Sequence, residues 1–260
     1  MNPFIFHLFG PLSVSWYGFL IVAGAALSLY FIYTDIRRSS IVTTTQFFDC
    51  ATGGAIGGLL GGKILFFLTE CRNVSVSSWE EVAAVALGGF AILGAIIGII
   101  VGVLVVARYY RADLIAVADL GAAYGLLAHA IARVGCFISG CCYGIPLKAG
   151  SYAVVYSDPA CLAPLSIPLL PTQLIMAVAS FVGFFLCMWI YHRRGRRDGL
   201  TFSFYVLWEC GARFVIDFWR GDRPALFYGL SLYQWVALGI ISAMLVFLAS
   251  VFLGKGKRRW

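Results

Sequence analysis

The chain has 260 residues, of which 61% are hydrophobic and 12% charged, and its mean hydropathy is +0.90. A soluble domain carries roughly twice this charged fraction, so the composition excludes a soluble globular protein and leaves too little polar sequence for a separate soluble domain. The net charge is +7, from 19 lysines and arginines against 12 acidic residues.

Seven apolar segments approach or exceed the ~20 residues needed to cross ~30 Å of hydrocarbon. In chain order we expect them at residues 15–33, 47–68, 82–107, 114–132, 172–191, 200–218 and 233–252. The N-terminal stretch has no basic n-region and no small-residue cleavage site, so we expect no signal peptide. The 29 glycines suit close packing of helices in lipid. The sequence thus predicts an all-α polytopic membrane protein with about seven transmembrane helices and one integral membrane domain over residues 1–260.

The positions of lysine and arginine predict the orientation, because cytoplasmic connections carry the excess of these residues. One side holds twelve of them: Arg37, Arg38, Arg108, Arg111, Arg193, Arg194, Arg196, Arg197, Lys255, Lys257, Arg258 and Arg259. The opposite side holds four: Arg72, Lys148, Arg220 and Arg223. We therefore expect the N-terminus outside and the C-terminus in the cytoplasm. This bias explains the net charge, so no nucleic-acid partner is expected.

The outer side carries the longest non-spanning stretch, at about residues 135–170, and it opens with an unusual motif. The sequence Arg-Val-Gly-Cys-Phe-Ile-Ser-Gly-Cys-Cys-Tyr-Gly, residues 133–144, combines one cation with three thiols and three glycines. An arginine near hydrocarbon costs a few kcal/mol unless it is paired or binds an anion. A glycine-rich turn lets backbone N–H groups approach a phosphate. The motif predicts a site for a lipid phosphate at the outer face.

The ionisable residues expected within spans are a second indication of a site: Asp49, Lys63, Asp119, Arg133, Glu209, Arg213 and Asp217. Arg213 and Asp217 are four residues apart, so on a helix they share one face, and Arg220 continues the row. One interpretation is a structural ion pair beside an arginine that reaches the interface. The other is an anion site in which Asp217 orients an arginine, since arginine suits bidentate contact with phosphate.

Tyr17 and the cysteines leave alternatives open. Tyr17 is either an interfacial aromatic residue or a hydroxyl directed into a cavity. The cysteines expected within spans are small apolar fillers: Cys50, Cys187 and Cys210. Those expected on the outer side are Cys71, Cys136, Cys141, Cys142 and Cys161, where a disulfide from Cys141 or Cys142 to Cys161 is one outcome and reactive thiol chemistry another. No metal is expected, because there is no C-x2-C pair and the three histidines are dispersed.

Several segments, taken in order, resemble the prolipoprotein diacylglyceryl transferases. Ser15-Trp-Tyr-Gly18 resembles the family's W-Y-G, Gly61-Gly62-Lys63 its G-G-R, Gly88 to Gly98 its glycine-rich third span, Arg133 to Gly140 its G-R-I-G-N-F-I-N-G signature, Pro171 to Leu174 its P-S-Q-L, Arg213 to Arg220 its R-x-x-V-E-F-F-R, and Gln234 its late glutamine. Seven spans with the N-terminus outside are also typical of the family.

The resemblance implies an activity. The family moves the diacylglyceryl group of phosphatidylglycerol onto the lipobox cysteine thiol of a prolipoprotein carrying a signal peptide, at the outer face of the bacterial cytoplasmic membrane. Glycerol phosphate leaves, and no cofactor is required. By resemblance, Arg133 and Arg213 hold the phosphate with Arg220 nearby, and Tyr17 binds the lipid or the acceptor. Further residues are then expected in the substrate site, as loop-shaping glycines, lining residues or orienting carboxylates: Gly140, Gly144, Cys136, Gln173, Asp119 and Asp217.

The chain departs from the family pattern at the positions expected to accept or donate protons. Cys136 and Cys141 occupy positions of an asparagine and a glutamate, Leu93 lies near the family's histidine, and Met176 replaces a glutamate. We therefore expect Cys141 to act as the base or a transient acceptor, because nearby arginines favour a thiolate. The alternatives are a membrane thiol or redox protein using Cys141, Cys142 and Cys161, and a non-catalytic homologue that binds phospholipid.

Overall fold

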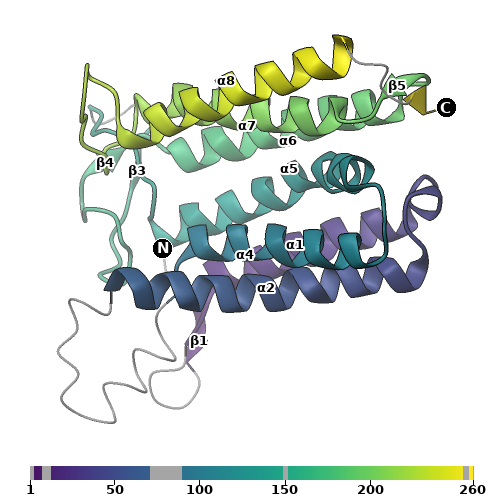
Figure 1. Cartoon of the computed structure of the whole chain (residues 1–260). Helices are drawn as coiled ribbons and strands as arrows, with labels where there is room; N and C mark the ends of the chain where they lie inside the picture. Colours follow the sequence, from purple (N-terminus) through teal and green to yellow (C-terminus); the bar gives the residue numbers. More distant parts are fainter. Residues whose placement is uncertain (1–2, 8–12, 71–89, 149–151, 254–257, 260) are drawn as a thin grey trace. The chain divides into compact units, whose positions relative to one another are not determined.

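The computed structural model describes residues 3–7, 13–70, 90–148, 152–253 and 258–259. Seven α-helices occupy most of this part (Figure 1): α1 Trp16–Thr34, α2 Thr44–Glu70, α4 Ile92–Tyr109, α5 Leu114–Ser139, α6 Thr172–His192, α7 Leu200–Asp217 and α8 Leu232–Leu253. Three short antiparallel pairs accompany them: β1 Phe4–His7 with β2 Ser13–Ser15, β3 Val154–Val155 with β4 Pro168–Leu169, and β5 Arg196–Arg197 with β6 Arg258–Arg259. A 3-10 turn, η1, covers Arg38–Ser40.

Each of the seven predicted segments overlaps one of these helices, which confirms the all-α polytopic membrane architecture. Six of the helices in the described part are long and apolar enough to cross a membrane, and the exception is α7. Its 18 residues include Glu209, Arg213 and Asp217, so charge and not length separates it from the others. The first residues of the predicted third segment, 82–89, lie outside the described residues, as does Cys71.

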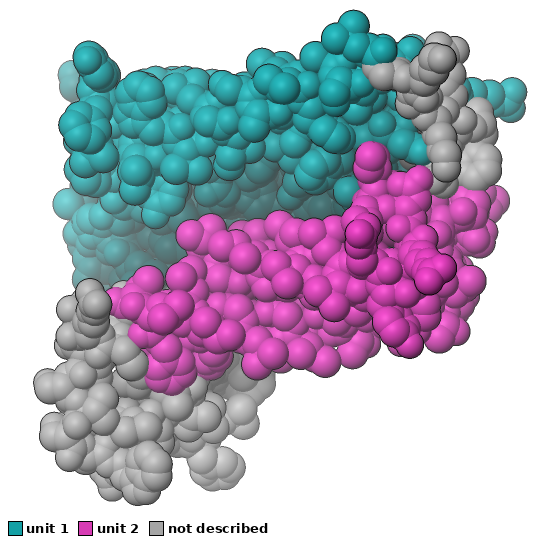
Figure 2. All heavy atoms as spheres, viewed as in Figure 1, with its two compact units in different colours: residues 1–32, 118–260 teal, residues 33–117 magenta. Residues whose placement is uncertain are grey.

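The chain divides into two compact units, residues 1–32 with 118–260 and residues 33–117 (Figure 2). The first unit contains the motif of residues 133–144 and all the predicted site residues. The second contains α2 and α4, together with Leu93. The expectation of one integral membrane domain over the whole chain stays a prediction.

In the second unit, α2 and α4 pack at backbone contact through glycine. A Cβ added to Gly57 would collide with the carbonyl oxygen of Gly98, and one added to Gly98 would collide with that of Gly57. Two helix backbones can approach this closely only where both carry the smallest residues. The close approach adds van der Waals contacts between the helices that lipid does not supply. The glycine-rich composition of these segments therefore has a packing role.

In the first unit, the region between α5 and α6 folds around a small core: Tyr156, Cys161, Ala163 and Leu169. The Tyr156 hydroxyl donates a hydrogen bond to the Phe137 carbonyl at 2.8 Å, which ties this core to α5. The sequence predicted that this helix ends near Ala132, but α5 continues to Ser139. The helix therefore carries both Arg133 and Cys136, and the predicted outer loop begins later.

Asp119 has a structural role that the sequence did not predict. Its carboxylate is fully buried and accepts hydrogen bonds from the backbone N–H groups of Gly199 at 2.9 Å and Phe202 at 2.8 Å. These N–H groups belong to the start of α7, where no helical partner exists for them. Arg133 is fourteen residues further along α5, or about 21 Å at the usual helical rise. The prediction that Asp119 orients the arginines of the outer site is therefore wrong.

Replacing Asp119 with asparagine should lower the free energy of unfolding by about 1.5–3 kcal/mol, the range for a hydrogen bond to a charged group. The asparagine amide has one acceptor oxygen where the carboxylate has two. Its NH2 group would therefore face one of the backbone N–H donors, of Gly199 or Phe202, and leave that donor without an acceptor. The measurement is the thermal unfolding midpoint of the full chain in detergent. Asp113→Asn is the matched control, because Asp113 caps the start of α5 at a position that is only half-buried. Equal midpoints for Asp119→Asn and the unchanged chain would contradict this role.

Candidate active site

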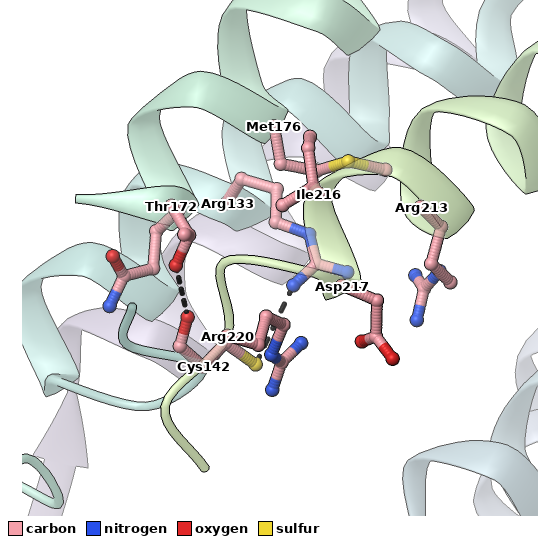
Figure 3. Close-up of a pocket in the computed structure, with 9 residues that line it drawn as sticks. Arg133, Cys142, Thr172, Met176, Arg213, Ile216, Asp217 and Arg220 are labelled. Atoms are coloured by element: carbon pink, nitrogen blue, oxygen red, sulfur yellow. Dashed lines mark hydrogen bonds between the residues drawn. The ribbon is translucent and has the colours of Figure 1, made fainter. Parts of the chain in front are cut away.

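A pocket in the first unit lies where the end of α5, the start of α6 and the end of α7 come together with the segment that follows α5 (Figure 3). Nine residues line it: Arg133, Cys142, Thr172, Gln173, Met176, Arg213, Ile216, Asp217 and Arg220. Three guanidinium groups therefore share one pocket although they come from two helices and a loop. Arg133 and the arginines near the end of α7, which lie some 80 residues apart in sequence, line one pocket.

The segment after α5, called here the thiol loop (residues 140–146), is fixed by the first turn of α6. The Thr172 hydroxyl donates to the Cys142 carbonyl at 2.8 Å. The Gln173 amide donates to the Cys141 carbonyl at 2.8 Å, and its side chain is almost fully buried. Gln173, which the sequence placed in the substrate site, thus lines the pocket while its amide nitrogen holds the loop backbone.

Two glycines allow the path of the thiol loop. Gly140 has φ +72°, a left-handed conformation that other residues adopt at a cost. A Cβ on Gly144 would lie 2.5 Å from the Leu170 carbonyl oxygen. The loop is also bonded to the segment that follows α7, because the Gly221 N–H donates to the Tyr143 carbonyl at 3.0 Å. This bond brings Arg220 beside Cys142.

Arg133 is oriented by a histidine on its own helix. Its Nε donates to His129 Nε2 at 2.8 Å, so the ring proton belongs on Nδ1. Nδ1 lies 3.1 Å from the Ser180 hydroxyl and 2.9 Å from Glu209 Oε2. The contact with Glu209 is at ion-pair distance but lacks hydrogen-bond geometry. With Nε engaged, the Nη groups of Arg133 are directed into the pocket (Figure 3).

Glu209 also pairs with Arg213, whose Nη2 lies 3.2 Å from Oε1. A chain of contacts therefore runs from Arg133 through His129 and Glu209 to Arg213. The three histidines are dispersed in the sequence, and neither His129 nor Glu209 is among the site residues predicted from it. The available signal was the four-residue spacing of His129 from Arg133 and of Glu209 from Arg213, which places each pair on one helical face.

Asp217 lines the pocket but does not pair with the arginines that the sequence predicted. It accepts hydrogen bonds from Arg223 Nη1 at 2.7 Å and from the Ser231 hydroxyl. Arg220 instead pairs with Asp222, with Nε 2.8 Å from Oδ1. The predicted row of Arg213, Asp217 and Arg220 on one helical face is wrong because α7 ends at Asp217. Arg220 enters the pocket from the segment beyond the helix.

Three thiols meet beside Arg133 and form what we call the thiol cluster: Cys136, Cys141 and Cys142. Their Sγ atoms all lie within 4.8 Å of one another. Arg133 Nη1 is 3.6 Å from the Cys142 sulfur and 4.0 Å from that of Cys136. This convergence could not be read from spacing, because only the turn after Ser139 returns Cys141 and Cys142 to the end of α5.

The cluster changes two expectations about the cysteines. Cys141 and Cys142 carry free thiols, and Cys161 donates to the Ile138 carbonyl at 3.8 Å, so the bridge to Cys161 that the sequence left open as one outcome is not formed. Thiol hydrogen bonds from Cys136 and Cys141 lower the pKa of Cys142, and Arg220 and Arg133 lower it further, whereas burial opposes this shift. Hydrogen bonding within the cluster and then burial raise the pKa of Cys141. Negative charge thus favours Cys142 over Cys141, the thiolate expected from the sequence.

Tyr17 lies at the same site. Gly135 of α5 faces the backbone of α1 here, since a Cβ on Gly135 would lie 3.1 Å from the Tyr17 Cα. The start of α1 at Tyr17 therefore lies against the end of α5 that carries Arg133 and Cys136. Of the predicted site residues, Asp119 alone lies away from this region.

Comparison with known proteins identifies the family. The sequence profile described as prolipoprotein diacylglyceryl transferase matches residues 3–250. A phosphatidylglycerol–prolipoprotein diacylglyceryl transferase of Clostridium tetani is 32% identical over 248 residues, which cover 95% of this chain and 97% of the relative. Similarly named proteins of Clostridium perfringens and Dehalococcoides mccartyi are 31% and 30% identical, over 90% and 93% of this chain and 90% and 89% of their own lengths. The chain belongs to the prolipoprotein diacylglyceryl transferase family.

Proposed function

We propose that the chain transfers the diacylglyceryl group of phosphatidylglycerol to the lipobox cysteine thiol of a prolipoprotein. The reaction takes place at the outer face of a bacterial cytoplasmic membrane, with the N-terminus outside and the C-terminus in the cytoplasm. The observation that carries the proposal is the convergence of Arg133, Arg213 and Arg220 on one pocket. The names of the relatives, which contain both substrates, support it.

The reaction forms a bond between the acceptor sulfur and the glyceryl carbon and breaks the bond from that carbon to the phosphate oxygen. The electron pair of the broken bond leaves with glycerol phosphate, so negative charge grows on the phosphate. Arg133 and Arg213 hold this charge, with Arg220 beside them. Preorganised donors of this kind stabilise a transition state because they need no reorientation during the reaction.

His129 and Glu209 act as positioning residues for these arginines. His129 occupies the Nε of Arg133, which leaves its Nη groups for the phosphate. Glu209 fixes Arg213 through an ion pair four residues away on α7. The carboxylate of Glu209 offsets part of the positive charge of the three arginines. The pocket remains positively charged because it has three guanidinium groups, and it therefore suits an anionic lipid headgroup. Tyr17 contributes a hydroxyl to the lipid or the acceptor.

The proposal predicts that the purified full chain releases glycerol phosphate from phosphatidylglycerol only with a thiol acceptor. The assay supplies phosphatidylglycerol in detergent micelles with a lipobox peptide, and the matched control peptide has serine in place of its cysteine. We expect release and lipidated peptide with the cysteine peptide alone. A folded chain that retains bound phosphatidylglycerol but forms neither product would contradict transfer and favour the lipid-binding alternative.

A further inference from the structure

The thiol cluster has the composition of a soft-metal site. Zinc binds thiolates at about 2.3 Å in a tetrahedron, so its sulfur ligands lie about 3.8 Å apart. The three Sγ atoms lie within 4.8 Å of one another, and small side-chain rotations close this difference. Three cysteine ligands leave one coordination position open, as in catalytic zinc sites, whereas structural sites are closed by a fourth protein ligand.

The neighbours of the cluster fit this assignment. His129, the histidine nearest in sequence, accepts a hydrogen bond from Arg133 through Nε2 and so does not complete the coordination. A divalent ion with three thiolates carries one net negative charge. Arg133 Nη1, which is 3.6 Å from the Cys142 sulfur, offsets this charge and also hydrogen-bonds a ligand sulfur from the second coordination shell.

The backbone of two of the three cysteines is held in place. Thr172 and Gln173 fix the carbonyl groups of Cys142 and Cys141, each at 2.8 Å. Cys142 itself has φ +60°, which is unfavourable for a residue with a Cβ. The hydrogen bonds from Thr172 and Gln173 hold the loop in this conformation, which directs the Cys142 side chain at the cluster. Cys136 is buried on the last turns of α5, where the helix fixes its backbone. The backbone of all three cysteines is therefore held in place.

We propose that Cys136, Cys141 and Cys142 bind a thiophilic divalent ion such as Zn²⁺, and that the open position takes the acceptor thiol as a thiolate. The inference rests on the proposed function, and it assigns the activation of the acceptor to residues that replace the family's asparagine and glutamate. A coordinating thiol loses its proton outright, so the chain needs no carboxylate base at position 141. Cys142 lines the arginine pocket, which places the ion beside the phosphate.

On coordination the acceptor S–H bond breaks and its proton passes to water. The metal-bound sulfur then donates an electron pair to the glyceryl carbon, and the carbon–oxygen bond breaks toward the phosphate. Glycerol phosphate leaves as an anion held by the arginines. The product is an uncharged thioether, which is a weaker ligand than a thiolate and vacates the position.

The test begins with the metal alone. The full chain is purified under reducing conditions with Zn²⁺, dialysed, and analysed for bound metal. We expect about one ion per chain, the stoichiometry of a single three-thiolate site. Replacement by Co²⁺ should give thiolate-to-cobalt charge-transfer absorption. Adding the lipobox peptide without phosphatidylglycerol should strengthen this absorption, because a fourth thiolate joins the ion, and the serine peptide should leave it unchanged.

Variants locate the site. Cys141→Ser and Cys142→Ser should lose the bound ion and the cobalt absorption, and Cys161→Ser should keep both, since Cys161 lies outside the cluster and donates to Ile138. Removing the ion with a chelator should lower glycerol phosphate release by about 100-fold, the lower end of what proton handling supplies, and adding Zn²⁺ should restore it. Because the cobalt spectrum is recorded on the unaltered chain, misfolding of a variant does not decide the outcome.

The outcomes separate the inference from the proposed function. A chain without bound metal or cobalt absorption, whether its cluster thiols are reduced or joined in a disulfide, overturns the metal site. Full activity of the chelated chain overturns the role in activation and leaves the transferase intact. A spectrum that the cysteine peptide does not change overturns acceptor coordination. If the loaded chain binds the peptide thiol but releases no glycerol phosphate, the transferase proposal fails and the metal site stands.

Discussion

Replacing Arg133 with alanine is expected to lower kcat/KM for glycerol phosphate release by about 10²–10³-fold, the loss typical of one preorganised donor to developing charge. Arg133 is the arginine that contacts both parts of the site, because it lines the pocket and its Nη1 approaches the Cys142 and Cys136 sulfurs. Its removal takes a cation from the leaving phosphate. The measurement is the initial rate with the lipobox peptide over a range of phosphatidylglycerol concentrations.

Two variants test the reason for this loss. Arg133→Lys retains a charge but cannot bond His129 and the pocket together, so we expect an intermediate rate. Arg197→Ala is the control for loss of a cation elsewhere, because Arg197 donates to the Val251 and Phe252 carbonyls at the end of α8. Activity of Arg133→Ala equal to that of Arg197→Ala would show that the phosphate is held by other groups.

The helices were predictable from sequence because long apolar runs have few alternatives in lipid. The predicted segment 172–191 and the observed α6, Thr172–His192, differ by one residue. The prediction for α5 ended too early because it stopped before its first cation. Arg133 lines the pocket and Cys136 is buried in the thiol cluster, and the helix continues through both residues to Ser139.

The site was predictable as a set of residues but not as a set of pairs. The motif of residues 133–144 and the segment 213–220 indicated the three arginines, because cations near hydrocarbon need an anionic partner. Which carboxylate meets which arginine depends on where a helix stops and how two helices align. Asp217 binds Arg223 since α7 ends there, and His129 meets Glu209 across two helices. Neither contact has a signal in spacing alone.

The largest expected effect on stability is at Asp217. Its side chain is almost fully buried and bonds Arg223, whose own side chain is 13% exposed, and the Ser231 hydroxyl. These bonds fasten the segment after α7 to the start of α8. Removing one partner of a buried ion pair leaves an uncompensated charge and costs about 3–5 kcal/mol. We therefore expect Asp217→Ala to lower the free energy of unfolding by this amount, measured by thermal unfolding of the full chain in detergent.

A double-mutant cycle distinguishes loss of this pair from a general loss of packing. Arg223→Leu removes the buried cation, so adding it to Asp217→Ala should restore part of the stability, because neither charge is then left without its partner. The Arg223 guanidinium also lies 3.5 Å from the centre of the Tyr233 ring, so recovery should be incomplete. Asp217→Asn keeps an acceptor for Ser231 and should lose less than Asp217→Ala. Losses that simply add in the double variant would mean that Asp217 and Arg223 stabilise the segment independently.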